Sequence, residues 1–497
     1  LTNSRDNLIS SNYYYKLRQY SLYGSAQLSY RDLAFLTITC RNDWSSTLPE
    51  KNNSYFYPSI SGSVILDRAF NFKIPIIDYW KLRGGWSKVG SDADPYQLAT
   101  VYVSETAFKG NPLQISSGEG NNSDLKPEET ISYEFGSEIS LSNNRLRGDF
   151  TYYHTDSRNQ ILRLATTAAS GYTTQVRNAG YIRNYGFEAQ LGLTPIILRN
   201  TFRWDVDINF ASNKSKVVKL DDEGLITSYQ LYSSGIQILA AVGEPYGTLF
   251  GSAYTRDTNG QIVVDANGLP KVSSTSKVFG KYTPDWIGGI NNKFTYRNIS
   301  LSFLIDASIG GKIFSNTNKT GKYTGVLENT LSGRDSEHGG LWYYINNGQR
   351  IGIENPQYTT SSTGLYYASI SGENTRVYQD GIIVQGVTEN GEKNTTIVSA
   401  ENYYHRLYSI AESNVYSASY VKLREVALSY AFPSKIIKHW YIQSLSLALV
   451  ARNLCIIHKD APNIDPESAI TAGNAQGVEA YSLPTTRTFG FNINVSF

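Results

Sequence analysis

Several long segments of the sequence alternate strictly between apolar and polar residues, and this alternation constrains the fold more than any other feature. In 131–141 the apolar residues stand at odd positions, with Ser137 the single exception. In 202–210 and in 489–497 every second residue is again apolar. An amphipathic helix would repeat its apolar residues every three or four positions. The pattern therefore predicts β-strands with one apolar and one polar face.

The same alternation predicts thirteen strands, most of them long. Their ranges are 19–30, 32–42, 58–69, 79–90, 129–142, 145–156, 181–193, 199–212, 284–296, 298–309, 419–431, 442–453 and 485–497. Strands of globular proteins commonly have about 5–6 residues, whereas a strand that crosses a membrane at a tilt needs about 9–11. The lengths therefore favour a membrane β-barrel over a soluble β-sandwich, which also alternates.

The connections between these strands alternate between short and long. The short or moderate ones are at Arg31, 70–78, Asn143–Asn144, Thr194–Leu198, Arg297 and 432–441. The long ones are 43–57, 91–128, 157–180, 213–283, 310–418 and 454–484. A chain that runs up and down across a membrane, with turns on one side and loops on the other, produces this alternation. Because 310–418 is so long, we expect it to have structure of its own.

The odd number of predicted strands indicates an incomplete barrel. Bacterial barrels made from one chain have an even number of strands, and an open sheet edge is not stable in lipid. We therefore expect residues 1–497 to form part of a larger transmembrane antiparallel β-barrel, with its first strands missing from this chain. The last strand follows a long loop, so the chain should end on the short-turn, periplasmic side.

Composition excludes several other classes of protein. The chain has 45 Lys and Arg against 43 Asp and Glu, a net charge of +2, which gives no electrostatic footprint for nucleic acid. No run approaches 18 apolar residues, so the sequence predicts no transmembrane helix. The two cysteines, Cys40 and Cys455, are too few for a disulfide framework, and we predict that both are free thiols.

Motifs for catalysis or metal binding are missing from the sequence. The five histidines are scattered, and neither a zinc-protease motif nor a nucleophile elbow is present. Residues 257–268 could suggest a calcium loop, but they lack the Glu that such a loop requires at its twelfth position. Two Asn-Gly pairs flanking Ile262–Val264 fit a small hairpin better. We therefore predict neither an enzyme nor a bound metal or cofactor.

Two groups of residues are candidates for function. The first consists of charged residues on the polar strand faces, which would line a wet lumen in a barrel and merely meet solvent in an ordinary sheet. This group includes Glu134, Glu138, Arg203, Asp205 and Asp207, accompanied by Arg147, Asp149 and Glu188. The second is the aromatic run Trp342, Tyr343 and Tyr344, which could bind substrate by stacking. We favour the alternative that this run packs the core of its own long loop.

Several motifs resemble the SusC-like branch of the TonB-dependent outer-membrane transporters. They are Arg41–Pro49 with Asn53–Ser59, Lys81–Arg83 with Val89–Tyr96, Asn178–Glu188, Pro284–Asn292, Ala418–Val426 and Ala451–Leu454. Each motif is weak alone, but together they cover most of the chain. Cys40 and Cys455 depart from what is usual in these barrels.

The resemblance implies a barrel of about 22 strands around an N-terminal plug, and neither the plug nor a TonB-contacting segment is recognisable here. The thirteen strands would then be the last thirteen. It further implies TonB-dependent import of oligomeric nutrients across the outer membrane of a Gram-negative bacterium, with a SusD-like surface lipoprotein as a lid. Glycan and peptide cargo both remain open. The alternatives are a secreted all-β adhesin or glycan-binding protein and, with less support, an outer-membrane enzyme.

Overall fold

The computed structural model describes residues 12, 14–70, 74–198 and 201–497. These residues form two compact units. Unit 1 comprises Leu1–Ala189 and Lys214–Tyr229, and unit 2 comprises Gln190–Asn213 and Gln230–Phe497.

The principal sheet contains thirteen antiparallel strands, and they follow one another in chain order. They are β1 (Gln19–Tyr30), β2 (Ala34–Ser45), β3 (Ser54–Ile65), β4 (Ile77–Ser91), β8 (Glu128–Leu141), β9 (Leu146–Arg158), β12 (Tyr181–Leu198), β13 (Phe202–Lys219), β18 (Trp286–Tyr296), β19 (Ile299–Ile309), β28 (Tyr420–Ala431), β29 (Ser444–Lys459) and β31 (Thr488–Ser496). Each predicted strand coincides with one of them. The strand predicted at 58–69 is β3, which begins four residues earlier and ends where Leu66–Ala69 forms the helical turn α1.

The short connections are tight turns that use left-handed backbone conformations. Ser142, Asn143 and Asn144 have φ values of 56°, 60° and 61°. Asparagine tolerates this region because its short polar side chain can bond to the local backbone. The turn predicted at Thr194–Leu198 is wrong, because β12 continues to Leu198. Residues 199–200, predicted as strand, and 71–73, predicted as connection, lie outside the described residues.

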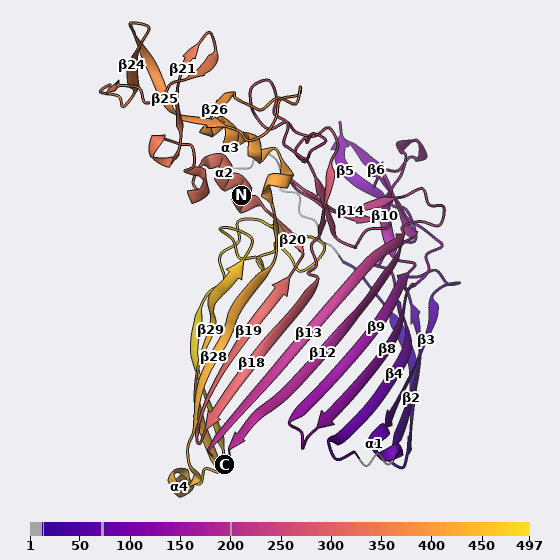
Figure 1. Cartoon of the computed structure of the whole chain (residues 1–497). Coiled ribbons are helices and arrows are strands. Elements are labelled where there is room, and N and C mark those ends of the chain that lie inside the picture. Colours follow the sequence, from indigo (N-terminus) through magenta and orange to yellow (C-terminus); the bar gives the residue numbers. More distant parts are fainter. Residues whose placement is uncertain (1–11, 13, 71–73, 199–200) are drawn as a thin grey trace. The chain divides into compact units, whose positions relative to one another are not determined.

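Unit 1 adds small elements to its strands at the ends of the long connections. They are a hairpin of β5 (Tyr102–Phe108) and β6 (Asn111–Ser116), a sheet of β7 (Glu119–Gly120), β10 (Ile161–Ala165) and β11 (Thr174–Asn178), and the 3-10 turn η1 (Ala168–Ser170). Leu125 and Val176 are fully buried in a cluster with Leu48 and Tyr55. Figure 1 shows β5 and β6 at one end of the unit 1 strands and α1 at the other.

Unit 2 contains two insertions between strands of the principal sheet. The first insertion, within residues 230–283, has β14 (Ser228–Ser233, beginning just before the unit boundary), β15 (Gln237–Ala241), β16 (Thr248–Gly251) and β17 (Lys277–Lys281). The second insertion, 310–418, has β20 (Lys312–Ser315), α2 (Asn316–Thr324), η2 (Glu328–Thr330), η3 (Ser336–His338), β21 (Leu341–Asn346), β22 (Gln349–Gly352), β23 (Tyr358–Thr360), β24 (Tyr366–Ile370), β25 (Glu373–Ile383), β26 (Ile397–Ser399), α3 (Ala400–Tyr408), η4 (Ala411–Asn414) and β27 (Val415–Ser417). The remaining elements of unit 2 are α4 (Ser434–Ile437), η5 (Lys438–Trp440) and β30 (Val478–Glu479).

The two insertions share an apolar core, so the expectation that 310–418 has structure of its own is confirmed. Phe314 of β20 is fully buried with Ile238 and Leu249 of the first insertion. The helices α2 and α3 pack on each other in this region. The hydroxyl of Ser315 accepts a hydrogen bond from the backbone N–H of Asn318 and so caps the start of α2. Figure 1 shows α2, α3, β21 and β24–β26 together beyond one end of β18, β19, β28 and β29.

The two Asn-Gly pairs of the first insertion form two consecutive turns. The carboxylate of Asp257 accepts from the backbone N–H groups of Asn259 and Gln261, and Asp265 does the same for Asn267 and Leu269. Isolated bridges on both sides of Ile262–Val264 replace the single hairpin that was predicted. No helix in the described part of the chain is both long and apolar enough to cross a membrane.

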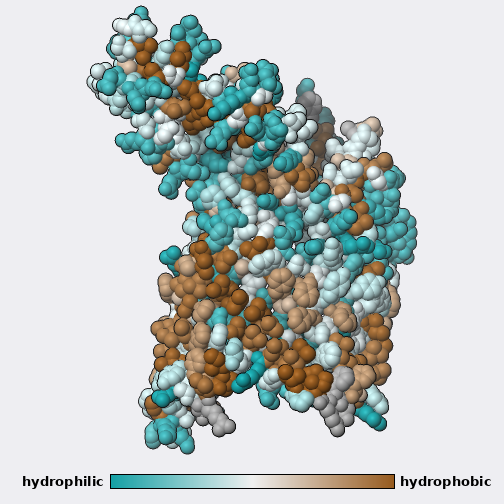
Figure 2. All heavy atoms as spheres, viewed as in Figure 1, coloured by the Kyte–Doolittle hydropathy of each residue, from teal (hydrophilic) through white to brown (hydrophobic). Residues whose placement is uncertain are grey.

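The principal sheet has one apolar and one polar face, as the alternation predicts. On β31 the apolar residues Phe489, Phe491 and Ile493 are 73%, 72% and 53% exposed. Figure 2 shows apolar residues gathered over the strands of unit 2 and hydrophilic residues over its insertions. Cys40 and Cys455 are free, and both are exposed.

Candidate functional site

The polar face of unit 1 carries a charged cluster on β4, β8 and β9. The guanidinium of Arg83 donates from Nη2 and Nη1 to the two carboxylate oxygens of Asp149, at 2.6 and 3.0 Å. The same guanidinium donates to the hydroxyl of Thr151 at 2.6 Å. This bidentate geometry fixes the guanidinium more firmly than a single contact would.

A glycine between the two partners makes the Arg83 pairing possible. Gly136 of β8 lies opposite Arg83 in the register, and Asp149 lies one strand further, on β9. A Cβ atom at Gly136 would lie 2.6 Å from Nε of Arg83. Only glycine therefore leaves the guanidinium free to cross β8.

The predicted residues Glu134 and Glu138 lie on this face beside Arg83. Nζ of Lys81 is 3.9 Å from a carboxylate oxygen of Glu138. Glu134 lines a recess of about 240 Å³ together with Lys81, Arg83 and Gly136. We call this the polar recess. Arg147 and Asp149 also belong to the polar face of β9, and Glu188 is exposed on β12.

A second charged cluster of unit 1, missed by the sequence analysis, surrounds Asp156. Its carboxylate accepts from Nε of Arg183 at 2.9 Å and lies 3.4 Å from Arg158 and 3.3 Å from His154. Asp156 is 7% exposed. The signal was present, because His154, Asp156 and Arg158 follow at a spacing of two on one strand.

The predicted residues of unit 2 form a separate cluster on β13. Nε of Arg203 donates to Asp205 at 2.7 Å, and the hydroxyl of Thr194 donates to the same carboxylate at 2.8 Å. Asp207 follows on the same face, opposite Asn291. The structure thus brings Arg203 and Asp205 together within unit 2, and it places Glu134 and Glu138 on one face of β8 within unit 1.

The most extensive ion-pair network of unit 2 joins strand residues to the loop before β31. Nζ of Lys422 lies 2.6 Å from Asp465 and 2.5 Å from Glu467. Arg424, two residues further on β28, contacts Glu467 at 2.7 Å and also Asp306 of β19. Lys422 and Asp465 are 3% and 5% exposed. We call these five residues the loop clamp.

Hydrogen bonding keeps the two loop carboxylates of the loop clamp, Asp465 and Glu467, ionised. Burial would raise the pKa of Glu467, but hydrogen bonds from Arg424, Lys422 and Tyr420 lower it to about 2. Burial likewise opposes ionisation of Asp465, and hydrogen bonds from Lys422 and Thr485 lower its pKa. Asp465 and Glu467 are therefore both ionised at neutral pH.

The three candidate aromatic residues occupy different environments in the second insertion. Trp342 packs with Tyr358 and Tyr366, with ring centroids 4.8 and 5.5 Å away. Tyr343 is 2% exposed, stacks on Tyr378 at 5.1 Å and donates to Asp380. Burial raises the pKa of Tyr343 to about 12. Tyr344 is half-buried, and strand alternation places it on the same side as Trp342.

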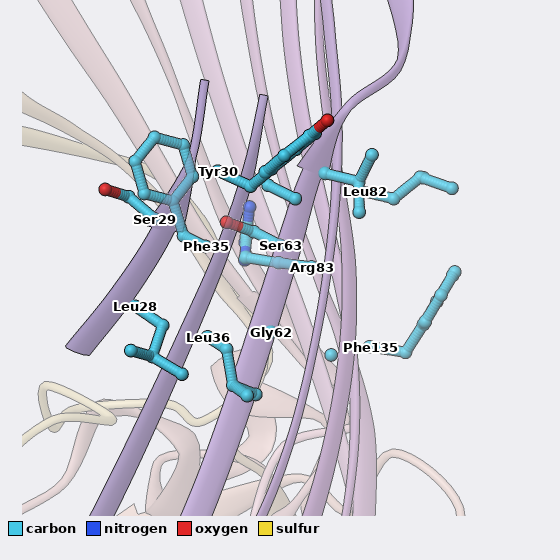
Figure 3. A pocket seen from close by; sticks show the side chains of 13 residues that line it. Leu28, Ser29, Tyr30, Phe35, Leu36, Gly62, Ser63, Leu82, Arg83 and Phe135 are labelled. Atoms are coloured by element: carbon cyan, nitrogen blue, oxygen red, sulfur yellow. The ribbon is translucent and has the colours of Figure 1, made fainter. Parts of the chain in front are cut away.

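The apolar face of unit 1 has a shallow groove of about 410 Å³ (Figure 3). Gly62 and Gly84 lie opposite each other in the register and form its floor. Leu28, Leu36 and Phe135 stand around them. Within the described residues, no group of three or more His, Cys, Asp or Glu side chains is arranged to hold a metal ion.

Comparison with known families accounts for both faces. Residues 2–454 match the model of the family described as "TonB dependent receptor-like, beta-barrel". The chain belongs to this family. TonB-dependent receptors are outer-membrane β-barrels of Gram-negative bacteria, so the apolar face of the sheet meets lipid. The secreted adhesin considered from the sequence is thereby set aside.

Two curated TonB-dependent receptors of Formosa agariphila are similar over most of this chain. TonB-dependent receptor P3 is 24% identical over 98% of this chain and 46% of its own length. TonB-dependent receptor P26 is 25% identical over 96% of this chain and 46% of its own length. The chain thus spans about half the length of the curated relatives it matches.

Solved structures confirm the fold. The structure of the RagAB peptide transporter matches with a TM-score of 0.67 and 18% identity, over 97% of this chain and 48% of that one. The RagAB peptide importer in its closed-closed state matches with a TM-score of 0.68 and 18% identity, over 96% and 48%. The family is one of transporters and receptors, and it is not an enzyme class.

Proposed function

We propose that this protein takes part in the TonB-dependent import of oligomeric nutrients across the outer membrane. The observation that most directly supports this function is that the principal sheet, in a chain of this barrel family, has two different faces. One face is apolar and exposed, and the other has paired charges such as Arg83 with Asp149. A water-filled passage requires the polar face, and lipid requires the apolar one. The RagAB proteins, described as a peptide transporter and importer, share the fold.

We further propose that the chain forms the C-terminal part of the family barrel. The chain matches only about half the length of each curated relative, which supports this proposal. The principal sheet also has thirteen strands, an odd number. A complete barrel would need further strands and the plug on which TonB acts. Residues 1–497 would then supply the passage wall and the outer loops.

The long insertions are proposed to lie outside the cell, where a SusD-like lipoprotein would cover them. The short turns, such as Asn143–Asn144, would face the periplasm. Within this arrangement Glu134, Glu138, Arg203, Asp205 and Asp207 face the lumen. Trp342, Tyr343 and Tyr344 stay candidate substrate-binding residues, and the burial of Tyr343 favours Trp342 and Tyr344 for direct stacking.

An uptake assay in the native host tests the proposed function. Cells that lack the gene should lose accumulation of a fluorescent oligopeptide or oligosaccharide pool, and cells that lack TonB should lose it equally. Wild-type and deletion cells accumulating every oligomer equally would contradict the proposal. If accumulation of only one of the two pools depends on the gene, that pool identifies the cargo as peptide or glycan.

Surface labelling tests the orientation separately. Cysteines placed in 91–128 or 310–418 should react with an impermeant maleimide on intact cells. A cysteine at Asn143 should react only after the outer membrane is opened. The reverse pattern would overturn the orientation and leave the transport proposal to the uptake assay.

A further inference from the structure

The insertions of unit 2 enclose a cavity of about 770 Å³. Its walls come from α2, α3, the end of β25 and the segment 254–270 of the first insertion. Ligand pockets in proteins commonly have volumes of about 300–1,000 Å³. The cavity is therefore large enough for one or two units of a peptide or an oligosaccharide.

Some of the polar side chains that line this cavity are available to bind a ligand, and one is already hydrogen-bonded within the protein. The hydroxyl of Tyr404 donates to the backbone oxygens of Asn329 and Ser332, at 3.0 and 2.9 Å, and is held in place. The Tyr403 hydroxyl and the Gln385 amide also line the cavity. Neither makes a hydrogen bond to another residue within the described part of the chain. Gln385 is exposed and Tyr403 is half-buried, so a bound ligand would replace the water that these two groups otherwise meet.

The cavity is also lined by a buried lysine. Lys322 of α2 is 7% exposed. Its Nζ donates to the backbone oxygen of Ser413 at 2.6 Å and to the amide oxygen of Asn414 at 3.1 Å. Both acceptors are neutral, and no carboxylate of the described residues lies within ion-pair distance. Burial lowers the pKa of Lys322 to about 8, so the ammonium stays largely protonated at neutral pH.

A comparison within unit 2 shows why this arrangement is unusual. Lys422 is buried to a similar degree, but Asp465 and Glu467 neutralise it at 2.6 and 2.5 Å. A buried charge is expensive to hold unless a counter-charge or several hydrogen bonds compensate for it. Lys322 has two hydrogen bonds and the ring of Tyr416 at 5.5 Å, and within the described residues it lacks a carboxylate partner.

We propose that this cavity binds a carboxylate group of an oligomeric ligand, with Lys322 as the cationic anchor and Tyr403 and Gln385 as hydrogen-bonding groups. The carboxylate would supply the missing counter-charge. It could come from the end or an acidic side chain of a peptide, or from a uronic acid of a glycan. Binding of a carboxylate in this cavity does not depend on the proposed function. Only the statement that this ligand is the imported cargo rests on it.

Direct titration of the purified protein in detergent tests the proposal without transport. The probes are trialanine, trialanine amide, digalacturonate and a neutral digalactoside. Binding of trialanine but not its amide indicates a peptide carboxylate, and binding of digalacturonate but not the neutral sugar indicates an acidic glycan. Failure of both acids to bind, or equal binding of acid and neutral forms, would overturn the proposal.

Substitutions at the cavity identify the anchor. Lys322→Met keeps the apolar stem and should weaken binding of the acidic probe about tenfold to a hundredfold, the range expected for a lost charged hydrogen bond. Lys319→Met is the matched control. Lys319 is on the same helix, is not among the residues lining the cavity, and lies over the ring of Tyr408 at 4.1 Å. Equal affinity of both variants and the wild type would mean that Lys322 only ties α2 to η4.

Folding of the variants is checked by thermal melting. If Lys322→Met does not fold, Tyr403→Phe and Gln385→Ala decide the question, because neither removes a hydrogen bond seen within the described residues. Each of these two substitutions should weaken binding of the acidic probe severalfold. Unchanged affinity for the acidic probe in both variants would overturn the proposal. An acidic probe that binds normally to a protein inactive in uptake would reject the proposed function alone.

Discussion

The principal sheet and the second insertion of unit 2 use large apolar residues in opposite ways. On β31, Phe489 and Phe491 are 73% and 72% exposed. In the insertion, Phe314, Val377 and Val398 are at most 2% exposed. Lipid surrounds the strands, so their apolar side chains need no protein partner. Water surrounds the insertion, so its apolar side chains must bury one another.

Charged residues show the converse difference. On the polar face of the strands charged residues pair closely, as Arg203 does with Asp205. Asp156, on the face of Ile131 and Tyr133, pairs with Arg183. In the insertion, the hydrogen-bonded pair of His338 and Asp335 lies at the surface. The solvent around each region thus decides where its apolar and charged side chains lie, and a substitution that does not suit that solvent should destabilise the region.

Loss of a core side chain in the insertion should have the largest effect. Phe314→Ala should lower the free energy of unfolding of the insertion by about 3–5 kcal/mol, since it opens a cavity at a fully buried site. Limited proteolysis of the membrane-embedded protein should then cut the insertion and spare the strands. Val326→Ala, at a residue 75% exposed, is the control and should change little.

A charge on the lipid face of the strands should come next. Leu449→Arg replaces a residue of β29 that is 59% exposed, and it should cost about 2–4 kcal/mol if Leu449 lies near the bilayer midplane. Ala448→Arg, next in sequence but on the polar face, is the control. Urea unfolding in lipid vesicles measures both. Equal losses would contradict the assignment of the faces.

The loop clamp should depend on pH. The folded pKa of Glu467 is lowered to about 2, whereas an unfolded Glu has about 4.3. Its contribution is therefore complete above about pH 4.3 and lost as the pH falls towards 2. Pepsin should cut 460–487 only in that acidic range.

A substitution isolates this contribution. Glu467→Gln should lower the stability of the loop by about 1–3 kcal/mol at neutral pH, since three charged or hydroxyl donors lose their ionised acceptor. The loop of this variant should also lose the part of its acid dependence that comes from Glu467, whereas Asp465, whose pKa is lowered too, keeps its own part. Glu373→Gln, at an exposed residue of β25, should leave the wild-type profile unchanged.

The smallest effect is expected at the polar face of unit 1. Gly136→Ala would place a Cβ 2.6 Å from Nε of Arg83 and displace the pair with Asp149. Because both partners are about a third exposed, the loss should be about 1 kcal/mol. Gly62→Ala, whose Cβ would meet nothing closer than 3.7 Å, should be neutral. Urea unfolding distinguishes the two.

The sequence predicted the strands well because each carries its own alternation. β1 and β19 have the predicted ends or differ by one residue. The turn predicted at Thr194–Leu198 is wrong because β12 continues through Pro195 to Leu198. The insertion stayed unassigned because its short strands are too brief for a clear period.

The candidate site was predicted only in part. Alternation identified the polar faces, so Arg203 and Asp205 were found together. It could not reveal the partners of Asp156 or Lys422, because these come from other strands or from loops, such as Arg183 and Asp465. Nor could it show that Tyr343 is buried while its neighbours are half-exposed, which depends on pairing with β25.

The central claim is that the apolar face of the principal sheet meets lipid and the polar face meets water. Cys40 is on the apolar face of β2. Thr37, on the opposite face of the same strand, lines the polar recess. With Cys455 replaced by Ser, Cys40 in native outer membranes should react with a lipid-soluble maleimide but not with a charged one. Thr37→Cys, in a Cys40→Ser background, should react with the charged reagent. Labelling of Cys40 by the charged maleimide as fast as Thr37→Cys would contradict the account.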